Sequence, residues 1–502
     1  MILTVDHKYM SSTKTSAHFL LIGGLLTKLI SFIGSILLAR YLFPEDYAYI
    51  MVAMIFSGLV QMLGNMGFEN YYLQKEIVDD TEEEDTLFVT FIMRIGVNTL
   101  LFFLQFIGAY VYASIWGESV VTELVKYFSF ALLITAITQI NLYVLRKKLN
   151  YKPEVYANTG RDLMTTLAQV LFAINGFGAL SFVFGSLIGN MIRTLVILYY
   201  QRYFPIKYNW NQEVAKNVYF FGKHSLLAGI GTYATQQVDK IILTSFFPSA
   251  IVGFYYFASS QSRTIFSYLI HPQGSLIISY SAKYKNDKIR LYRILSQIGY
   301  LITSLLAPVI VYLVFFAEPI FVLVFGEKWI PAVPLFQIFL LYYFTTEITF
   351  PLSGILMAFG LPQIASKLVL YRFFFLSVGL LLGSYLSDNI VVYLLIFTGI
   401  SFIFTWIKAY ISLKQLEKTI FNYVHQIYKG FVLLCIYIVV LIISMYISDN
   451  IQVQMSISAV LFVLVSFVMH LSIYKKELLD TVKLIFNNEH KLVRLLERKF
   501  AV

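Results

Sequence analysis

Apolar runs recur along almost the whole chain at the length that a membrane-spanning helix requires. An α-helix rises 1.5 Å per residue, so about 20 apolar residues cross the hydrocarbon core of a bilayer. The pattern predicts about fourteen such spans, joined by short polar connections. They are expected at 18–39, 47–68, 87–109, 127–144, 163–176, 179–200, 224–246, 253–281, 295–316, 334–358, 368–386, 390–407, 430–447 and 453–474.

The composition agrees with this pattern. Hydrophobic residues make up 58% of the chain and charged residues only 13%, whereas soluble domains have roughly 45–50% and about 25%. The sequence therefore predicts an all-α integral membrane protein. Cys435 is the only cysteine, which excludes a disulfide framework and a cysteine metal cluster. The first apolar run is too long for a signal-peptide core, so we expect it to remain as the first helix.

The basic residues predict the orientation. Alternate connections are rich in Lys and Arg, whereas the remaining connections hold only Arg40, Lys126 and Lys328. By the positive-inside rule, both ends are then expected in the cytoplasm. The net charge of +10 is thereby explained by membrane orientation, and nucleic acid is not expected as a partner.

Two polar segments have their own interpretation. The segment 75–85 is acidic, and it is either a solvated loop or an ionic latch to basic cytoplasmic loops. The tail 475–502 repeats apolar residues at helical spacing beside basic ones. This predicts an amphipathic helix on the anionic inner leaflet, or alternatively a contact with a partner protein.

The chain also contains a faint internal repeat. Residues 41–44 read YLFP and residues 245–248 read SFFP, and each tetrapeptide joins two predicted spans. The two copies lie six spans apart, as they do in transporters built from two related six-helix halves.

Four segments carry a resemblance to a known family. Residues 38–47 resemble the first outer loop of bacterial polysaccharide flippases of the O-antigen and teichuronic-acid type. Further similar segments follow in the same order at 238–255, 325–334 and 353–363. The chain departs from the family pattern at Phe43 and Ala48, where glycine is usual, which suggests a stiffer outer hairpin.

The resemblance implies the multidrug/oligosaccharidyl-lipid/polysaccharide exporter superfamily and its fold. That fold has two pseudo-symmetric six-helix bundles in a V, here 1–201 and 202–414, with two further helices at 415–474. The implied function is the flipping of undecaprenyl-diphosphate-linked oligosaccharide repeat units from the inner to the outer leaflet of the cytoplasmic membrane by alternating access. The implied partners are that lipid-linked glycan, membrane lipids, and a polysaccharide polymerase or glycosyltransferases.

Six basic residues fall within predicted spans. A charge near the bilayer centre costs at least about 2.5–3.5 kcal/mol unless it is paired or hydrated, so these side chains are candidates for a cavity that binds the substrate diphosphate. They are Lys28, Lys240, Arg263, Arg94, Arg193 and Arg372.

Each candidate also has a structural interpretation. Arg94, Arg193 and Arg372 lie within two turns of the cytoplasmic end, where snorkelling explains them as well. Lys28 could pair with a carbonyl or with Glu347, and Lys240 could form a packing salt bridge with Asp239 beside it. These alternatives are left open by the sequence.

Three residues are candidates for ion coupling. Asp239 and Glu347 are acids at membrane depth, so H⁺ or Na⁺ binding there could bias two conformational states. His271 precedes Pro272 inside a predicted span, and a helix histidine in that position is either a packed residue or a proton site. No other cofactor is expected, and no metal site.

Two other functions are alternatives to a flippase. A small-molecule exporter of the multidrug type shares the implied fold, but sites for cationic drugs usually contain carboxylates. A membrane enzyme would require larger outer loops, and the sequence shows no nucleophile elbow, metal-ligand spacing or phosphate-binding glycine loop. We therefore expect a transporter and no enzymatic activity.

Overall fold

The computed structural model describes residues 27–75, 79–116, 118–148, 150–203, 210–270 and 274–469, and every regular element within these ranges is a helix. The chain divides into two compact units, Met1–Gly253 and Phe254–Val502. The lobe boundary expected near residue 201 stays a prediction.

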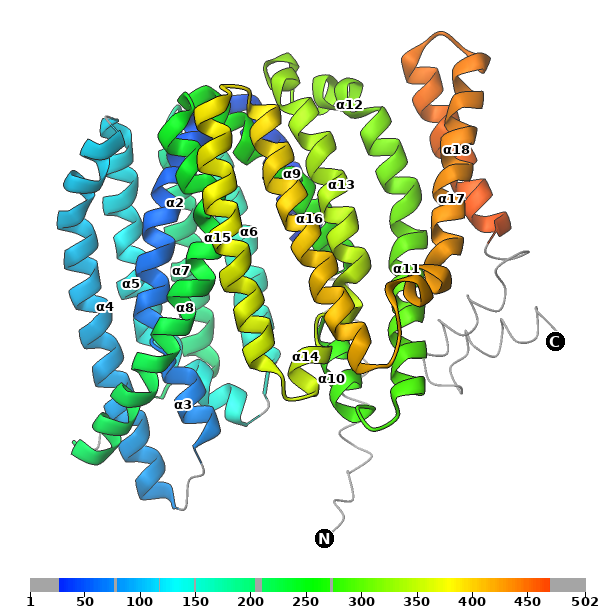
Figure 1. Cartoon of the computed structure of the whole chain (residues 1–502). Coiled ribbons are helices and arrows are strands. Elements are labelled where there is room, and N and C mark those ends of the chain that lie inside the picture. The colour runs from blue at the N-terminus through cyan, green and yellow to red at the C-terminus, as the bar shows by residue number, and fades with distance from the viewer. Residues whose placement is uncertain are drawn as a thin grey trace. The chain divides into compact units, whose positions relative to one another are not determined.

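The first helix that the structure describes in unit 1 covers residues 27–41. Its further helices are α2 (Pro44–Asn65), α3 (Phe68–Gln74), α4 (Asp80–Trp116), α5 (Ser119–Lys147), α6 (Lys152–Ile174), α7 (Leu180–Tyr200) and α8 (Gln212–Phe246). Helices α2, α4 and α5 lie side by side, and α6 packs along α7 (Figure 1).

The joint between the first two helices is fixed by hydrogen bonds to one carboxylate. Pro44 stands at the first position of α2, where its missing N–H costs nothing. Asp46 Oδ2 accepts from Phe43 N at 2.9 Å, and its Oδ1 accepts from Ala179 N at 3.1 Å. One side chain in the first family-like segment therefore ties this hairpin to the turn before α7.

Unit 2 consists of longer helices interrupted by short ones. They are α9 (Ser249–Ile270, which starts just before the boundary), α10 (Gly274–Lys283), α11 (Lys288–Phe315), α12 (Ala317–Val324), η2 (Glu327–Ala332), α13 (Val333–Thr349), η3 (Phe350–Leu352), α14 (Ile355–Ala358), α15 (Pro362–Leu386), α16 (Ile390–Gln415), α17 (Ile420–Ile447) and α18 (Ile451–Val468). Helix α11 packs against α13 and α17, and α15 packs against α16. Pro308 lies inside α11, which continues through it, whereas Pro351 falls in η3 where α13 ends.

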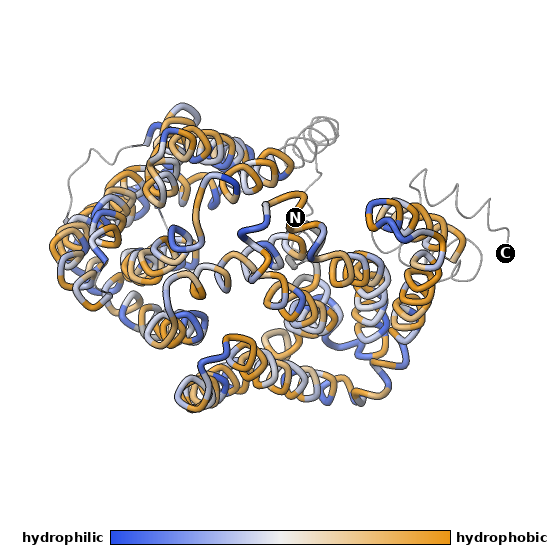
Figure 2. The backbone as a smooth tube through the Cα atoms, turned by 90° about the horizontal axis from the view of Figure 1, so that it is seen from above, coloured by the Kyte–Doolittle hydropathy of each residue, from blue (hydrophilic) through white to orange (hydrophobic). Residues whose placement is uncertain are grey.

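The helices support the membrane assignment. Within the described residues, ten stretches are long and apolar enough to cross a bilayer. Figure 2 shows hydrophobic positions along the helices, interrupted by hydrophilic ones. Three further predicted spans coincide with α6, α8 and α9, which are long but more polar, and the first expected span lies partly outside the described residues. The chain is a multi-pass membrane protein, and the count of fourteen stays a prediction.

Several helices begin well before the apolar runs that predicted them. Helix α6 starts at Lys152, α8 at Gln212 and α17 at Ile420, each about ten residues before the expected span. All three extensions lie at ends that the basic residues assign to the cytoplasm. The orientation stays a prediction, as does the amphipathic tail 475–502, which lies outside the described residues.

Candidate functional site

Unit 1 contains a polar cavity of about 450 Å³ between five of its helices. Helices α2, α4, α5, α6 and α7 each contribute to its walls. Three arginines and one aspartate are the charged residues of the lining, so the cavity has a formal charge of +2. The charged and amide side chains are Arg94, Arg161, Arg193, Asp162, Asn65, Asn98, Asn190, Gln61 and Gln139.

The walls of the cavity are polar because polar residues recur at helical spacing on the helices that form them. On α7, Asn190 and Arg193 are three residues apart, and Ser186 precedes Asn190 by four. On α6, Arg161, Asp162 and Thr165 form a similar set. Because residues at i, i+3, i+4 and i+7 share one face of a helix, these side chains line one cavity.

Arg94 is the most deeply buried of the three arginines, with 4% of its surface exposed. It donates to the Tyr143 hydroxyl at 2.6 Å and to Asn65 Oδ1 at 3.2 Å. Its Nε has no hydrogen-bond partner among the described residues. Because the guanidinium is held inside the unit, snorkelling to the membrane surface does not explain this arginine.

Arg161 and Arg193 come from adjacent helices and have lighter restraints. Arg161 pairs with its neighbour Asp162 at 2.8 Å, and both side chains remain more than a third exposed. Arg193 Nε donates to Asn158 Oδ1 at 3.0 Å. Both guanidinium groups therefore retain donors for a ligand in the cavity, since each has five N–H groups.

Two glycines bring these arginines close together. A Cβ on Gly189 of α7 would lie 1.9 Å from Thr165 Oγ1 and 2.8 Å from the Arg161 carbonyl oxygen. A Cβ on Gly185, one turn earlier, would lie 2.9 Å from the backbone nitrogen of Gln169. Small residues spaced by four permit this close backbone approach in membrane helices. The α6–α7 contact thus sets the distance between Arg161 and Arg193.

A profile of the family described as polysaccharide biosynthesis protein matches residues 37–334, more than half of the chain. The chain belongs to this polysaccharide biosynthesis protein family. This confirms the resemblance inferred from the sequence motifs.

Curated relatives are distant and are aligned over part of their length. The chain is 21% identical over 310 residues to the succinoglycan biosynthesis transport protein ExoT of Rhizobium meliloti, covering 61% of each chain. It is 25% identical over 319 residues to the teichuronic acid biosynthesis protein TuaB of Bacillus subtilis, covering 61% of this chain and 62% of that one.

Solved structures show the fold of this polysaccharide biosynthesis protein. It is similar to the lipid II flippase MurJ in an inward closed conformation, with a TM-score of 0.66 and 14% identity, over 90% of this chain and 98% of that one. It is also similar to an inward-facing multidrug resistance transporter of the MATE family, with a TM-score of 0.59 and 11% identity, over 78% and 94%. The expected all-helical transporter fold is confirmed. Of these proteins, ExoT is named as a transport protein, MurJ as a flippase and the MATE protein as a transporter, and none of the four is named as an enzyme.

The structure of this family member places the other predicted residues of unit 1 outside the cavity lining. Lys28 is half-buried on the first helix. Lys240 is half-buried on α8 and donates to Gln237 Oε1 at 2.9 Å. Asp239 beside it is 6% exposed. Their assignments to substrate and ion binding stay predictions.

The predicted residues of unit 2 lie on three different helices. Arg263 on α9 is exposed. Arg372 on α15 donates to Ser401 Oγ at 3.2 Å and to the Tyr342 hydroxyl at 3.4 Å. Glu347 on α13 has one carboxylate oxygen, Oε2, that is buried without a hydrogen-bond partner among the described residues. His271 lies outside the residues that the structure describes.

Sequence reasoning missed Arg161 in this polysaccharide biosynthesis protein. It lies two residues before the predicted span 163–176, but α6 begins at Lys152, so Arg161 is part of the helix. The signal that could have found it is the polar set Asn158, Arg161, Asp162 and Thr165, whose spacing fits one helical face.

The acidic segment at the start of α4 is partly ordered by contacts within unit 1. Lys75 pairs with Glu82 at 2.9 Å, and the Tyr72 hydroxyl donates to Glu83 at 2.5 Å. The Tyr72 ring also stacks on Tyr143, the residue that accepts from Arg94, with 6.4 Å between ring centroids. The acidic segment is therefore linked through two tyrosines to the wall of the polar cavity.

Proposed function

We propose that this protein flips undecaprenyl-diphosphate-linked oligosaccharides from the inner to the outer leaflet of the bacterial cytoplasmic membrane by alternating access. The observation that carries the proposal is the cavity with three arginines and a single carboxylate. A lipid diphosphate has about two negative charges, which a formal charge of +2 would balance, and guanidinium groups form strong charge-assisted hydrogen bonds with phosphate oxygens. The names of the relatives, which refer to succinoglycan transport and teichuronic acid biosynthesis, support a glycan substrate.

The same cavity argues against a multidrug exporter for cationic compounds. A cationic drug would meet three guanidinium groups and only Asp162, which is already paired with Arg161. Like charges repel at the short distances that binding in the cavity would impose. The similarity to the MATE transporter is one of fold, and it says nothing about the substrate of this protein.

The arginines test the proposal directly. Proteoliposomes would receive a fluorescent undecaprenyl-diphosphate-linked saccharide, and its appearance in the outer leaflet would be measured. We expect Arg161→Gln and Arg193→Gln each to lower the rate by about tenfold or more, since a hydrogen bond to a charged group contributes about 1.5–3 kcal/mol. Arg202→Gln is the matched control, because Arg202 is exposed at the end of α7 and bonds only the Leu198 carbonyl oxygen among the described residues.

Full activity in both cavity variants, with thermal stability unchanged, would contradict the proposal. A loss in Arg202→Gln as large as in the cavity variants would also contradict it, because the effect would then follow from surface charge. Parallel assays of Lys28→Gln, Lys240→Gln, Arg263→Gln and Arg372→Gln test whether those side chains also contact the substrate.

Ion coupling is a second part of the proposal, and Asp239 and Glu347 are its candidate residues. A carboxylate at membrane depth is costly unless it is protonated or binds a cation. We expect an imposed H⁺ or Na⁺ gradient to accelerate flipping, and Glu347→Gln or Asp239→Asn to abolish that acceleration. Equal rates with and without either gradient would remove the coupling role from both residues.

A further inference from the structure

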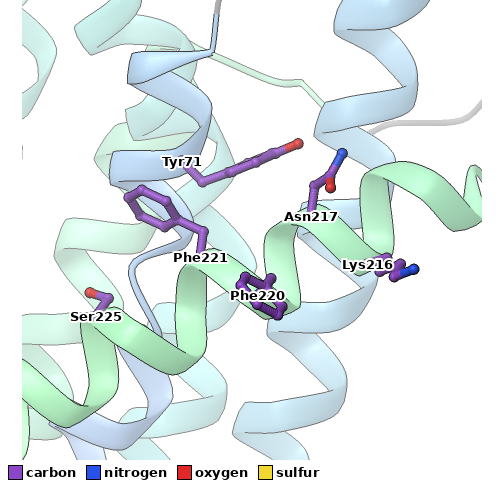
Figure 3. A pocket seen from close by; sticks show the side chains of 6 residues that line it. All are labelled: Tyr71, Lys216, Asn217, Phe220, Phe221 and Ser225. Carbon is purple, nitrogen blue, oxygen red and sulfur yellow. The ribbon is translucent and has the colours of Figure 1, made fainter.

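A second hollow of unit 1, which we call the groove, lies between α3 and the first turns of α8. Its volume is about 720 Å³, and it shares no lining residue with the polar cavity. Three aromatic rings and three polar side chains line it, as Figure 3 shows. They are Tyr71, Phe220, Phe221, Lys216, Asn217 and Ser225.

The groove exists because the start of α8 is amphipathic. Asn211 caps the helix by accepting from two backbone N–H groups. Val214 and Val218, 5% and 1% exposed, pack into a cluster with Phe68 of α3. The remaining face presents Phe220, which is 61% exposed. The helix is thus fastened on one side and leaves an aromatic surface open on the other.

The polar side chains of this groove suit an anionic head group. Lys216 is exposed and makes no ion pair among the residues that the structure describes. By contrast, Lys75 at the end of α3 is neutralised by Glu82. Asn217, beside Lys216, adds amide donors. One carboxylate, Glu213, lies one turn earlier on α8 and is exposed.

The span predicted at 224–246 would place this groove at the end of a membrane helix. The polar turns of α8 precede the apolar run that begins near residue 224, and aromatic and lysine side chains are typical of that boundary. We propose that this groove binds an anionic phospholipid, with its phosphate at Lys216 and Asn217 and an acyl chain along Phe220 and Phe221. The binding is independent of the substrate in the polar cavity.

The position of the groove gives the lipid a structural consequence. Helix α2 ends at Asn65, and Met66 and Gly67 are both left-handed, with φ of 33° and 65°. A Cβ on Gly67 would lie 2.6 Å from Ser225 Oγ, a lining residue. A lipid in the groove therefore borders the break between α2 and α3, and we expect its binding to stabilise unit 1 against thermal unfolding.

The test uses the purified full chain in a mild detergent. Phosphatidylglycerol and phosphatidylcholine with the same acyl chains are added separately, binding is measured with spin-labelled lipid, and the thermal unfolding midpoint is recorded. We expect phosphatidylglycerol to bind more tightly and to raise the midpoint more. Lys216→Gln should weaken phosphatidylglycerol binding by about fivefold, the effect of one basic residue near a lipid surface, and Lys216→Arg should retain it.

Lys223→Gln is the matched control, because Lys223 is exposed on the same helix and is absent from the groove lining. Phe220→Ser should weaken binding of both lipids. Equal binding of the two lipids to the wild type would overturn the proposal, as would equal losses in Lys216→Gln and Lys223→Gln. An equal rise of the midpoint with glycerol phosphate alone would also overturn it, since the acyl chain would then contribute nothing.

Discussion

Replacement of Gly189 by alanine should loosen the contact that brings Arg161 and Arg193 together. The new methyl group would lie 1.9 Å from Thr165 Oγ1 and 2.8 Å from the Arg161 carbonyl oxygen. The hydroxyl can rotate away, but the backbone oxygen cannot, so α6 and α7 must separate. Overpacking of this kind costs about 1–3 kcal/mol, and each kcal/mol lowers the Tm of a unit of this size by roughly 2–4 °C.

The assay is thermal unfolding of Gly189→Ala in detergent, followed by titration with a soluble diphosphate ester. We expect a lower Tm together with weaker diphosphate binding. Adding Thr165→Ala removes the nearer clash and leaves the backbone one, so the double variant should recover part of the lost stability.

Two other helical glycines provide matched controls. A Cβ on Gly96 of α4 or on Gly399 of α16 would meet no described atom within 4 Å. Alanine at either position should leave the Tm unchanged or raise it, because alanine is favoured over glycine in a helix by up to about 1 kcal/mol. If Gly189→Ala behaves like Gly96→Ala in both stability and binding, then the α6–α7 contact does not set the arginine geometry.

Three further outcomes are expected. Tyr143→Phe leaves an Arg94 N–H without its acceptor, so the free energy of unfolding should fall by about 1.5–3 kcal/mol. An unchanged Tm would contradict this and would show that water replaces the hydroxyl. Asp46→Ala removes the acceptor of two backbone N–H groups, so we expect the free energy of unfolding to fall by about 1–2 kcal/mol. Asp46→Asn should be intermediate. Equal stability of the wild type and both variants would refute the capping role of Asp46. The Lys288 ammonium, 2.7 Å away, holds the pKa of Glu417 below its usual range, so the stabilisation by this pair is fully present above the ordinary carboxyl pKa and is lost as the pH falls through the lower folded value. The Tm advantage over Glu417→Gln should therefore decline once the pH falls below the ordinary carboxyl pKa of about 4.3, and an advantage independent of pH would contradict the role of the pair.

The sequence was sufficient for most helices because apolar runs of membrane length have few alternatives in a bilayer. It was poor at their polar ends. Helix α8 was expected from residue 224 but begins at Gln212, because its first turns alternate buried valines with lysine and asparagine and have no continuous apolar run. Arg161 was missed for the same reason, since hydropathy alone treats the polar first turns of a helix like a loop.

The sequence predicted the positive charge of the candidate site but not which residues would line it. Charge within the spans indicated a cationic interior, but neighbouring helices decide which charges face one cavity. Arg94 and Arg193 line the same cavity because α4 and α7 both border α5, and no spacing along the sequence contains that information. Lys240 looked similar in sequence, yet it lies on α8 beside Gln237 and outside the cavity lining.

The three cavity arginines are chemically unequal, and this difference bears on how an anion would bind. Arg94 is 4% exposed and has both terminal nitrogens bonded within the unit, so its contribution is a fixed positive field. Among the described residues, Arg161 is held by its adjacent Asp162, and Arg193 by the Asn158 amide through its Nε. An incoming diphosphate can therefore gain new hydrogen bonds from these two without breaking a buried one. Because Asp162 already partly neutralises Arg161, Arg193 is the arginine whose donors have the most to gain from the ligand, and Arg193→Gln should impair substrate binding more than Arg161→Gln.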